Sequence, residues 1–515
     1  MHLERENHDQ AFFGHPKPLS GLFFTELWER FSFYGIRPLL ILYMSALVAQ
    51  GGLGLDRPTS AAIVGLFGGS LYLITILGGW VADNWLGQSR SVWYGSLIIA
   101  LGHLSIALTA LFSPFFFYLG LILIVIGTGL FKTCISVIVG TLYAAQDSRR
   151  DAGFSIFYMG INLGALVSPL ISGLLVENYG WHWGFAVGGI GMLVALAIFR
   201  LISVPQLEKF DQAQGVSSTW QHAVNQNTRA PKIVALLGII LIAVIALVYF
   251  GIIHINPVVV ATYLTAIIVS AMLLYFGYYI LIAKNSAQDK KQLFICLVLL
   301  LIAALFWSAF EQTPTSLNLF AQDFTDRNIM GYEVPVIWFQ SINSVFIIIF
   351  APLFAWLWVH LSRSQRDPSY ITKFILALAL AAIGFYMMVF ASKAVIAADG
   401  ALVSPLWLVA TLLFLTFGEL CLSPVGLSTM TKLAPTMLRG QIMGLWFTAA
   451  ALGNVVAGLI GGHVSADNLH DMPTLFLRCT IALVLGAMVL WLFKKPLIKL
   501  ISKPSDSTTT LAHEN

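Results

Sequence analysis

One long apolar segment near the start of the chain contains four charged residues, Glu26, Glu29, Arg30 and Arg37. In a helix, with about 100° per residue, these side chains share one face that spans about 100°. A charged side chain costs roughly 2.5–3.5 kcal/mol in lipid, so this face must line a protein interior or an aqueous cavity. Protrusion of the helix end into water would account for Glu26. It would not account for Arg37, which lies about 24 Å from the start of the helix.

Single charges occur in three other apolar segments, at Lys132, Glu311 and Glu419. Counting about 1.5 Å per residue from the inner ends of the segments places Glu311 near the height of Arg37. The same count places Lys132 near the height of Glu419. Each of these two pairs could join two halves of the protein and act as a gate. The alternative is a static buried ion pair, which is weak evidence for function.

Carboxylates outnumber cations by one in this buried set, and a carboxyl group that gains and loses a proton as a bundle opens to either side is a proton-coupling device. Polar and aromatic residues in other segments complete a candidate cavity: Tyr34, Tyr72, Asn162, Gln312, Asn343 and Trp446. Cations at one end and a carboxylate at the other suit a small zwitterion, such as a dipeptide with terminal charges about 6–7 Å apart. Each of these residues could equally make an ordinary hydrogen bond between helices.

The composition indicates the elements that must position these residues. The 515-residue chain is 58% hydrophobic and 10% charged, against about 25% charged in a typical soluble domain. Apolar stretches long enough to cross a bilayer recur from residue 22 to residue 500, so we predict an all-α membrane protein. The alternation of a β-barrel is missing. All four cysteines lie in apolar segments without metal-binding spacing, so we expect no metal or cofactor, and no nucleic-acid partner.

We predict fourteen membrane-spanning helices from the apolar segments. Their approximate ranges are 22–49, 59–84, 91–113, 116–145, 151–176, 182–203, 231–252, 257–283, 292–318, 333–360, 370–392, 403–432, 438–462 and 473–500. Lys and Arg concentrate in the even-numbered connections, which places both termini in the cytoplasm by the positive-inside rule.

A weak internal repeat divides these spans, because residues 150–173 align without gaps on residues 439–462. Chance agreement among small and aliphatic residues is the alternative. The repeat pairs the fifth span with the thirteenth, so two spans must be inserted between two six-helix repeats, an arrangement typical of the major facilitator architecture. The predicted parts are an N-terminal cytoplasmic segment, a six-helix bundle, a cytoplasmic linker, an inserted two-helix hairpin, a second six-helix bundle and a disordered cytoplasmic tail. Their ranges are 1–21, 22–203, 204–230, 231–283, 292–500 and 501–515.

Motifs along nearly the whole chain resemble those of the proton-dependent oligopeptide transporters. The stretch "ELWERFSFYG" (26–35) resembles the signature E-x-x-E-R-F-x-Y-Y-G, with Phe33 in place of the first Tyr. The blocks "GGWVADNWLGQ" (78–88), "FEQ" (310–312) and "GELCLSPVGLS" (418–428) follow in the family's order. "GLFKTCISVIVGTLY" (129–143) also matches, except that Thr133 and Cys134 replace the usual Pro-Asn.

The resemblance implies a proton-driven symporter of di- and tripeptides in a bacterial inner membrane, functional as a monomer. It implies a role in proton coupling for Glu26, Glu29, Arg30 and Lys132, and an outer gate made by Arg37 and Glu311. It assigns Tyr34, Tyr72, Lys132 and Asn162 to the peptide carboxylate, Asn343 and Glu419 to the amine, and Trp446 to a side-chain pocket. Arg37 is also expected at the substrate.

Transport of another solute and an enzymatic activity are the alternative functions. The main alternative is a proton-coupled transporter of the same fold for another small solute, such as nitrate, an organic acid or an amino-acid-like compound. Glu419 argues against an anion site, because a buried carboxylate repels anions. We expect no enzyme, because no H-E-x-x-H, G-x-S-x-G or phosphate-binding loop occurs.

Overall fold

The computed structural model describes residues 9–109, 111–144, 147–215, 227–464 and 466–501. It is helical throughout these ranges, apart from loops and a small antiparallel ribbon of β1 (Asn328–Ile329) and β2 (Tyr332–Glu333). The helices are α1 Pro18–Ser45, α2 Arg57–Val81, α3 Gln88–Leu108, α4 Phe115–Thr141, α5 Arg150–Tyr179, α6 Trp181–Ile198, α7 Val204–Ala213, α8 Ala230–Tyr249, α9 Pro257–Gly277, α10 Ala287–Phe310, α11 Asn318–Phe324, α12 Phe339–Arg363, α13 Tyr370–Ala397, α14 Leu406–Leu433, α15 Arg439–Gly461 and α16 Met472–Ile501.

Among the described residues, thirteen helical segments are long and apolar enough to cross a membrane. The charged helix α1, with 28 residues, completes the fourteen predicted spans. Two spans are interrupted helices: α6 continues through a π-helical turn, Phe199–Ser203, into α7, and α10 continues through Thr313–Leu317 into α11. The second interruption contains Pro314, which cannot donate a backbone hydrogen bond.

Helix starts follow local sequence signals. Asp56, just before α2, accepts a hydrogen bond from the Thr59 amide, and Asn256, just before α9, accepts from two amides. Ser286 and Ser369 cap α10 and α13 in the same way. These side chains satisfy amide groups that have no partner in the first helical turn.

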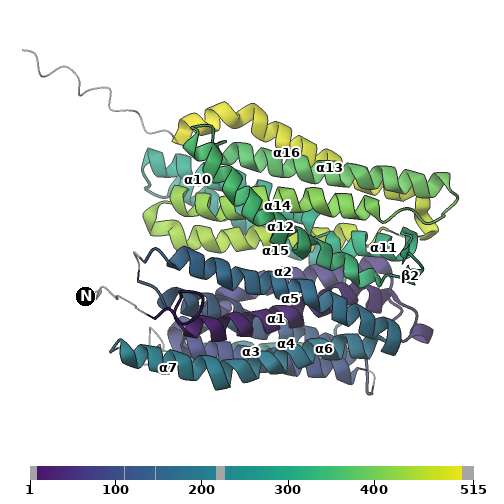
Figure 1. Ribbon diagram of the computed structural model, residues 1–515, viewed down its shortest axis with the longest axis horizontal. Coiled ribbons are helices and arrows are strands. Elements are labelled where there is room, and N and C mark those ends of the chain that lie inside the picture. The colour runs from purple at the N-terminus through teal and green to yellow at the C-terminus, as the bar shows by residue number, and fades with distance from the viewer. Residues whose placement is uncertain (1–8, 110, 145–146, 216–226, 465, 502–515) are drawn as a thin grey trace, which may run out of the picture.

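The helices form two halves that lie side by side (Figure 1). In the first half, α1 packs against α5 and α6, and α3 packs against α4. In the second half, α10 packs against α15, and α13 packs against α14 and α16. The predicted repeat has a structural counterpart, because Gly164 on α5 contacts the α1 backbone at Leu27, and Gly453 on α15 contacts α10 at Trp307.

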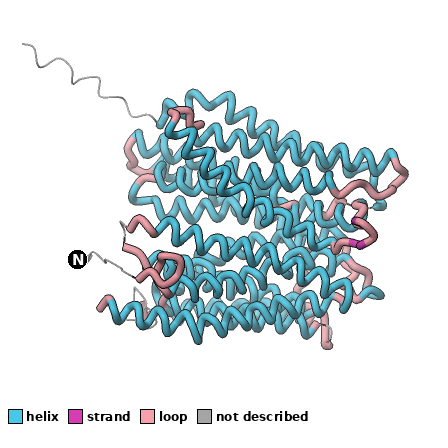
Figure 2. The backbone as a smooth tube through the Cα atoms, in the orientation of Figure 1, coloured by secondary structure: helices cyan, strands magenta, loops and turns pink. Residues whose placement is uncertain are grey.

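The spans run between two ends of the molecule, where the loops gather (Figure 2). We call the left end in the figures, where α1 begins and α16 ends, the terminal end, and the opposite end the distal end. The two halves touch mainly through α2 with α15 and α5 with α12. On the distal side, the Trp338 indole donates to the Leu170 carbonyl at 3.0 Å, and the Ser341 hydroxyl donates to the Leu166 carbonyl at 2.8 Å.

The segments between and beyond the halves differ in part from the predicted ranges. α7 makes the first part of the predicted linker helical, and residues 216–226 of it lie outside the described residues. In the predicted hairpin, α9 packs against α15 and α2, and the Tyr275 hydroxyl donates to Gln441 at 2.6 Å. Residues 1–8 and 502–515, which include nearly all of the predicted disordered tail, also lie outside the described residues.

Candidate functional site

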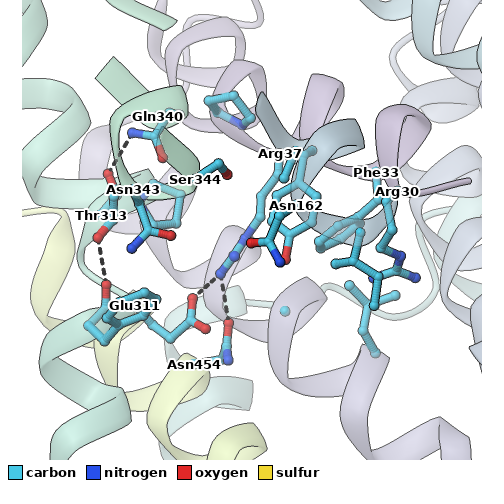
Figure 3. A pocket seen from close by; sticks show the side chains of 18 of the residues that line it. Arg30, Phe33, Arg37, Asn162, Glu311, Thr313, Gln340, Asn343, Ser344 and Asn454 are labelled. Atoms are coloured by element: carbon cyan, nitrogen blue, oxygen red, sulfur yellow. Dashed lines mark hydrogen bonds and ion pairs between the residues drawn. The ribbon is translucent and has the colours of Figure 1, made fainter. Parts of the chain in front are cut away.

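A cavity of about 170 Å³ lies between the two halves (Figure 3). Both halves contribute polar side chains to its wall. Those from the first half include Arg30, Tyr34, Arg37, Tyr72, Lys132, Tyr158 and Asn162, and those from the second half include Glu311, Gln340, Asn343, Ser344, Glu419 and Asn454. The two sets differ in charge, because three cations come from the first half and two carboxylates from the second.

The charged face of α1 turns into the protein, as the sequence predicts. Arg30 Nε lies 2.5 Å from a Glu29 carboxylate oxygen and 3.2 Å from a Glu26 carboxylate oxygen, and Arg30 Nη2 donates to Glu29 at 2.8 Å. Both carboxylates are at most 3% exposed. They lie behind the cavity wall and reach it through Arg30. Phe33 sits between two guanidinium groups, with its ring centroid 5.3 Å from Arg30 and 5.8 Å from Arg37.

The predicted Arg37–Glu311 ion pair is present and joins α1 to the end of α10. The same Arg37 nitrogen donates to the side-chain oxygen of Asn454 on α15 at 3.2 Å. Figure 3 shows the guanidinium group between these two acceptors. Three helices from both halves therefore converge on one cation on the distal side of the cavity.

The second predicted ion pair, Lys132–Glu419, is not formed in this structure, although both residues line the cavity. The Lys132 ammonium lies 4.2 Å from the centroid of the Tyr72 ring, in a cation–π contact. Glu419 instead accepts a hydrogen bond from Asn343 at 3.4 Å, and Asn343 also donates to Thr416 at 2.9 Å. Equal height in two helices did not bring the charges together, because packing sets the lateral distance between helices.

Two predicted cavity residues lie elsewhere. Trp446 is 5% exposed and packs against Phe374, with ring centroids 6.4 Å apart, and against Gly426. Gln312 is 1% exposed and bonds with Ser316 inside its own half. Neither residue is part of the cavity wall in this conformation. Tyr34, Tyr72, Asn162 and Asn343 do line the cavity, as predicted.

Sequence reasoning missed two further ion pairs between the halves on the distal side, both among the described residues. Arg57 Nη1 lies 2.5 Å from an Asp323 carboxylate oxygen and donates to the Val464 carbonyl at 2.8 Å. Arg327 lies 3.6 Å from Glu177, again across the halves. Both arginines stand in odd-numbered connections, where basic residues are rare. An isolated arginine in such a connection is the sequence signal that could have indicated a specific carboxylate partner.

Comparison with known proteins decides the family. A model of the POT family matches residues 89–472. The chain belongs to the POT family. Peptide transporter YePEPT of Yersinia enterocolitica is 56% identical to this POT family member over 500 residues, which cover 97% of the chain and 98% of the relative. A di-/tripeptide transporter of Lactococcus lactis subsp. cremoris is 34% identical over 503 residues, with 96% and 98% covered.

Solved structures agree with this family and confirm the predicted fold. A crystal structure of peptide transporter POT in complex with sulfate matches with a TM-score of 0.86 and 36% identity, and covers 96% of this chain and 98% of that one. A POT family transporter in complex with 5-aminolevulinic acid matches with a TM-score of 0.83 and 29% identity, with 95% and 98% covered. This POT family member is therefore a multi-pass helical membrane transporter of the major facilitator fold, and not an enzyme.

Proposed function

We propose that this chain is a proton-coupled symporter that imports di- and tripeptides by alternating access. The observation that carries this proposal is the opposite charge of the two cavity walls. Lys132, Arg30 and Arg37 face the cavity from the first half, and Glu419 faces it from the second. A zwitterionic peptide places a carboxylate and an ammonium group at its two ends, so it complements both walls at once.

The two cavity walls would bind opposite ends of the peptide. Lys132, Arg37, Tyr34, Tyr72 and Asn162 can donate hydrogen bonds to the peptide carboxylate. The amine would bind on the other side, at Glu419 and Asn343, whose hydrogen bond is long enough at 3.4 Å to be replaced by a ligand. Trp446 lies outside the cavity wall here, and its contact with a peptide side chain stays a prediction.

For the coupling ion we propose a proton carried by the Glu26–Glu29–Arg30 cluster, with Lys132 nearby on the cavity wall. Arg30 interacts with both carboxylates at once, although one cation balances only one of them. One Glu26 carboxylate oxygen is buried and has no hydrogen-bond partner among the described residues. A proton there would supply a donor to that site. No other cofactor is required by this mechanism.

We further propose that the terminal end faces the cytoplasm of a bacterial inner membrane and that a monomer is sufficient for transport. The distribution of Lys and Arg supports this orientation. The ion pairs Arg37–Glu311 and Arg57–Asp323 close the distal side, which makes this conformation outward-closed. Arg37 and Glu311 then act as the outer gate. Lys132 and Glu419, which are not paired with each other here, are candidates to approach one another when the cytoplasmic side closes.

The experiment that tests the proposed function is uptake of alanyl-alanine by purified protein in liposomes. We expect uptake to require an inward proton gradient and to acidify the lumen. Protein-free liposomes and liposomes with a protonophore are the controls. Equal uptake with and without the gradient would contradict symport.

A second candidate, transport of an amino-acid-like compound, is favoured by one observation. The structural relative bound to 5-aminolevulinic acid shares this fold, and that ligand carries a carboxylate and an amine. Competition between labelled 5-aminolevulinic acid and unlabelled alanyl-alanine would separate the candidates. Saturable uptake of the labelled acid that unlabelled alanyl-alanine does not inhibit would favour the second.

A further inference from the structure

We propose that Asn454 is a positioning residue of the distal gate, which holds the Arg37 guanidinium against Glu311 while α2 and α15 are packed together. This inference rests on the proposed gating role of Arg37 and Glu311. It adds a third residue, on α15, to the gate. It also couples the gate to the packing of α2 against α15, where the two halves meet.

The contacts of Asn454 fix its orientation. Its side-chain nitrogen donates to the Ala450 carbonyl one helical turn earlier at 3.0 Å, which directs its oxygen toward Arg37 at 3.2 Å. The residue is 3% exposed. A hydrogen bond between a buried neutral acceptor and a cation contributes about 1.5–3 kcal/mol. Without Asn454, one Arg37 nitrogen would keep Glu311 as its only acceptor among the described contacts.

The approach of α2 to α15 depends on glycines at the crossing point. A Cβ atom at Gly65 would lie 2.7 Å from the Cα of Gly458, and a Cβ at Gly458 would lie 2.6 Å from the Ala61 carbonyl oxygen. The two backbones are therefore in direct contact, which a larger residue would prevent. Asn454 lies one turn away from Gly458 on the same face of α15.

Gly68 on α2 provides the space through which Asn454 reaches Arg37. A Cβ atom at Gly68 would lie 2.2 Å from the Asn454 side-chain oxygen and 3.4 Å from its Cβ. The overlap is with the end of a side chain and not with backbone. A methyl group at position 68 would therefore displace the amide from Arg37 while leaving the packing of the two helices intact.

These contacts couple the opening of the gate to the separation of α2 from α15. When α2 and α15 separate on the distal side, Asn454 moves away with α15 and Arg37 loses one acceptor. The Arg37–Glu311 pair is then weaker and separates more readily. Closure reverses the order, because Asn454 returns to Arg37 only when the glycine contact has formed.

The test measures distal opening directly. Ser341, 3% exposed and bonded across the halves, is replaced by cysteine, and its labelling by a membrane-impermeant thiol reagent is timed in oriented vesicles. The protein without this cysteine gives the background from the native thiols. We expect Asn454→Ala and Gly68→Ala each to accelerate labelling about ten- to hundredfold, the factor that corresponds to loss of this hydrogen bond. Gly277→Ala is the matched control, because nothing lies within 4 Å of its added Cβ, and it should change nothing.

The double variant separates the proposed contact from general damage. With Asn454→Ala in place, Gly68→Ala has no amide left to displace, so the double variant should label no faster than Asn454→Ala alone. Additive acceleration would overturn the proposal. A gain-of-function test adds Asn454→Asp to Glu311→Gln, which returns a carboxylate to Arg37. We expect the pair to slow labelling relative to Glu311→Gln alone, and no recovery would contradict the proposal.

Failure of this inference is distinguishable from failure of the gate. If Glu311→Gln accelerates labelling and Asn454→Ala does not, the gate stands and Asn454 has no positioning role. If neither variant accelerates labelling, the gating role of Arg37 and Glu311 is itself wrong.

Discussion

At the scale of single residues, the buried charges are arranged around arginines. Arg30 interacts with two carboxylates of its own helix, and Arg37 interacts with acceptors from two helices of the other half. Phe33 separates the two guanidinium groups and contacts both. The first arrangement is local and suits a proton site, whereas the second spans the halves and suits a gate.

The gate predicts a specific result for charge reversal. Arg37→Glu and Glu311→Arg should each reduce alanyl-alanine uptake strongly, because each places two like charges side by side, which costs at least the roughly 3–5 kcal/mol of removing one partner of a buried pair. The double reversal should recover part of the loss, because the attraction between the two positions survives the exchange. Initial uptake rates at matched protein levels check this. A double variant no better than the worse single variant would show that the two groups do not interact.

At the scale of elements, the segment before α1 is tied to the terminal end of α4. The His15 ring nitrogen Nδ1 lies 2.9 Å from the Tyr143 hydroxyl, and Arg149 donates to the backbone oxygens of Asp9 and Gly14. Burial, and then the nearby Arg149 cation, lower the pKa of His15 below its ordinary value of 6.5, against an opposing effect of Asp147. Burial raises the pKa of Tyr143 to about 12.

The contacts that hold the segment before α1 against Tyr143 and Arg149 should therefore weaken in acid. The detached segment takes up a proton on His15 below about pH 6.5, while the attached segment resists protonation, so lowering the pH favours detachment. Above pH 6.5 both forms are neutral and His15 contributes no pH dependence. Protease cleavage before α1 should thus accelerate between pH 7.5 and pH 5.5. His15→Asn should remove this dependence, and an unchanged dependence in that variant would assign the effect to another group.

At the scale of the whole molecule, the distal side is held closed by contacts that involve both halves, while Lys132 and Glu419 remain apart. The proposed proton coupling should then be separable from the proposed alternating access, because the Glu29 carboxylate is not part of the distal contacts described here. Glu29→Gln keeps the side-chain shape but carries no titratable proton. We expect this variant to lose gradient-driven uptake and to retain exchange of labelled for unlabelled peptide. Driven uptake at the normal rate would exclude Glu29 as the proton carrier.

The sequence by itself determined the features that depend on neighbours along the chain. The fourteen spans follow from apolar length, and the inward face of α1 follows from the spacing of Glu26, Glu29, Arg30 and Arg37. The similar height of Arg37 and Glu311 follows from counting residues along their helices. These features persist in the structure because helix geometry fixes height and direction from the sequence alone.

Only the tertiary structure decided which side chains meet across helices. Equal height also suggested Lys132–Glu419, yet each side chain has another partner here. Trp446 turned away from the cavity, and Asn454 turned toward Arg37, although both lie on α15. The physical reason is that lateral distance and helix rotation are set by packing at points such as Gly65 and Gly458. Such contacts join residues far apart in the chain, which no count along one helix can bring together.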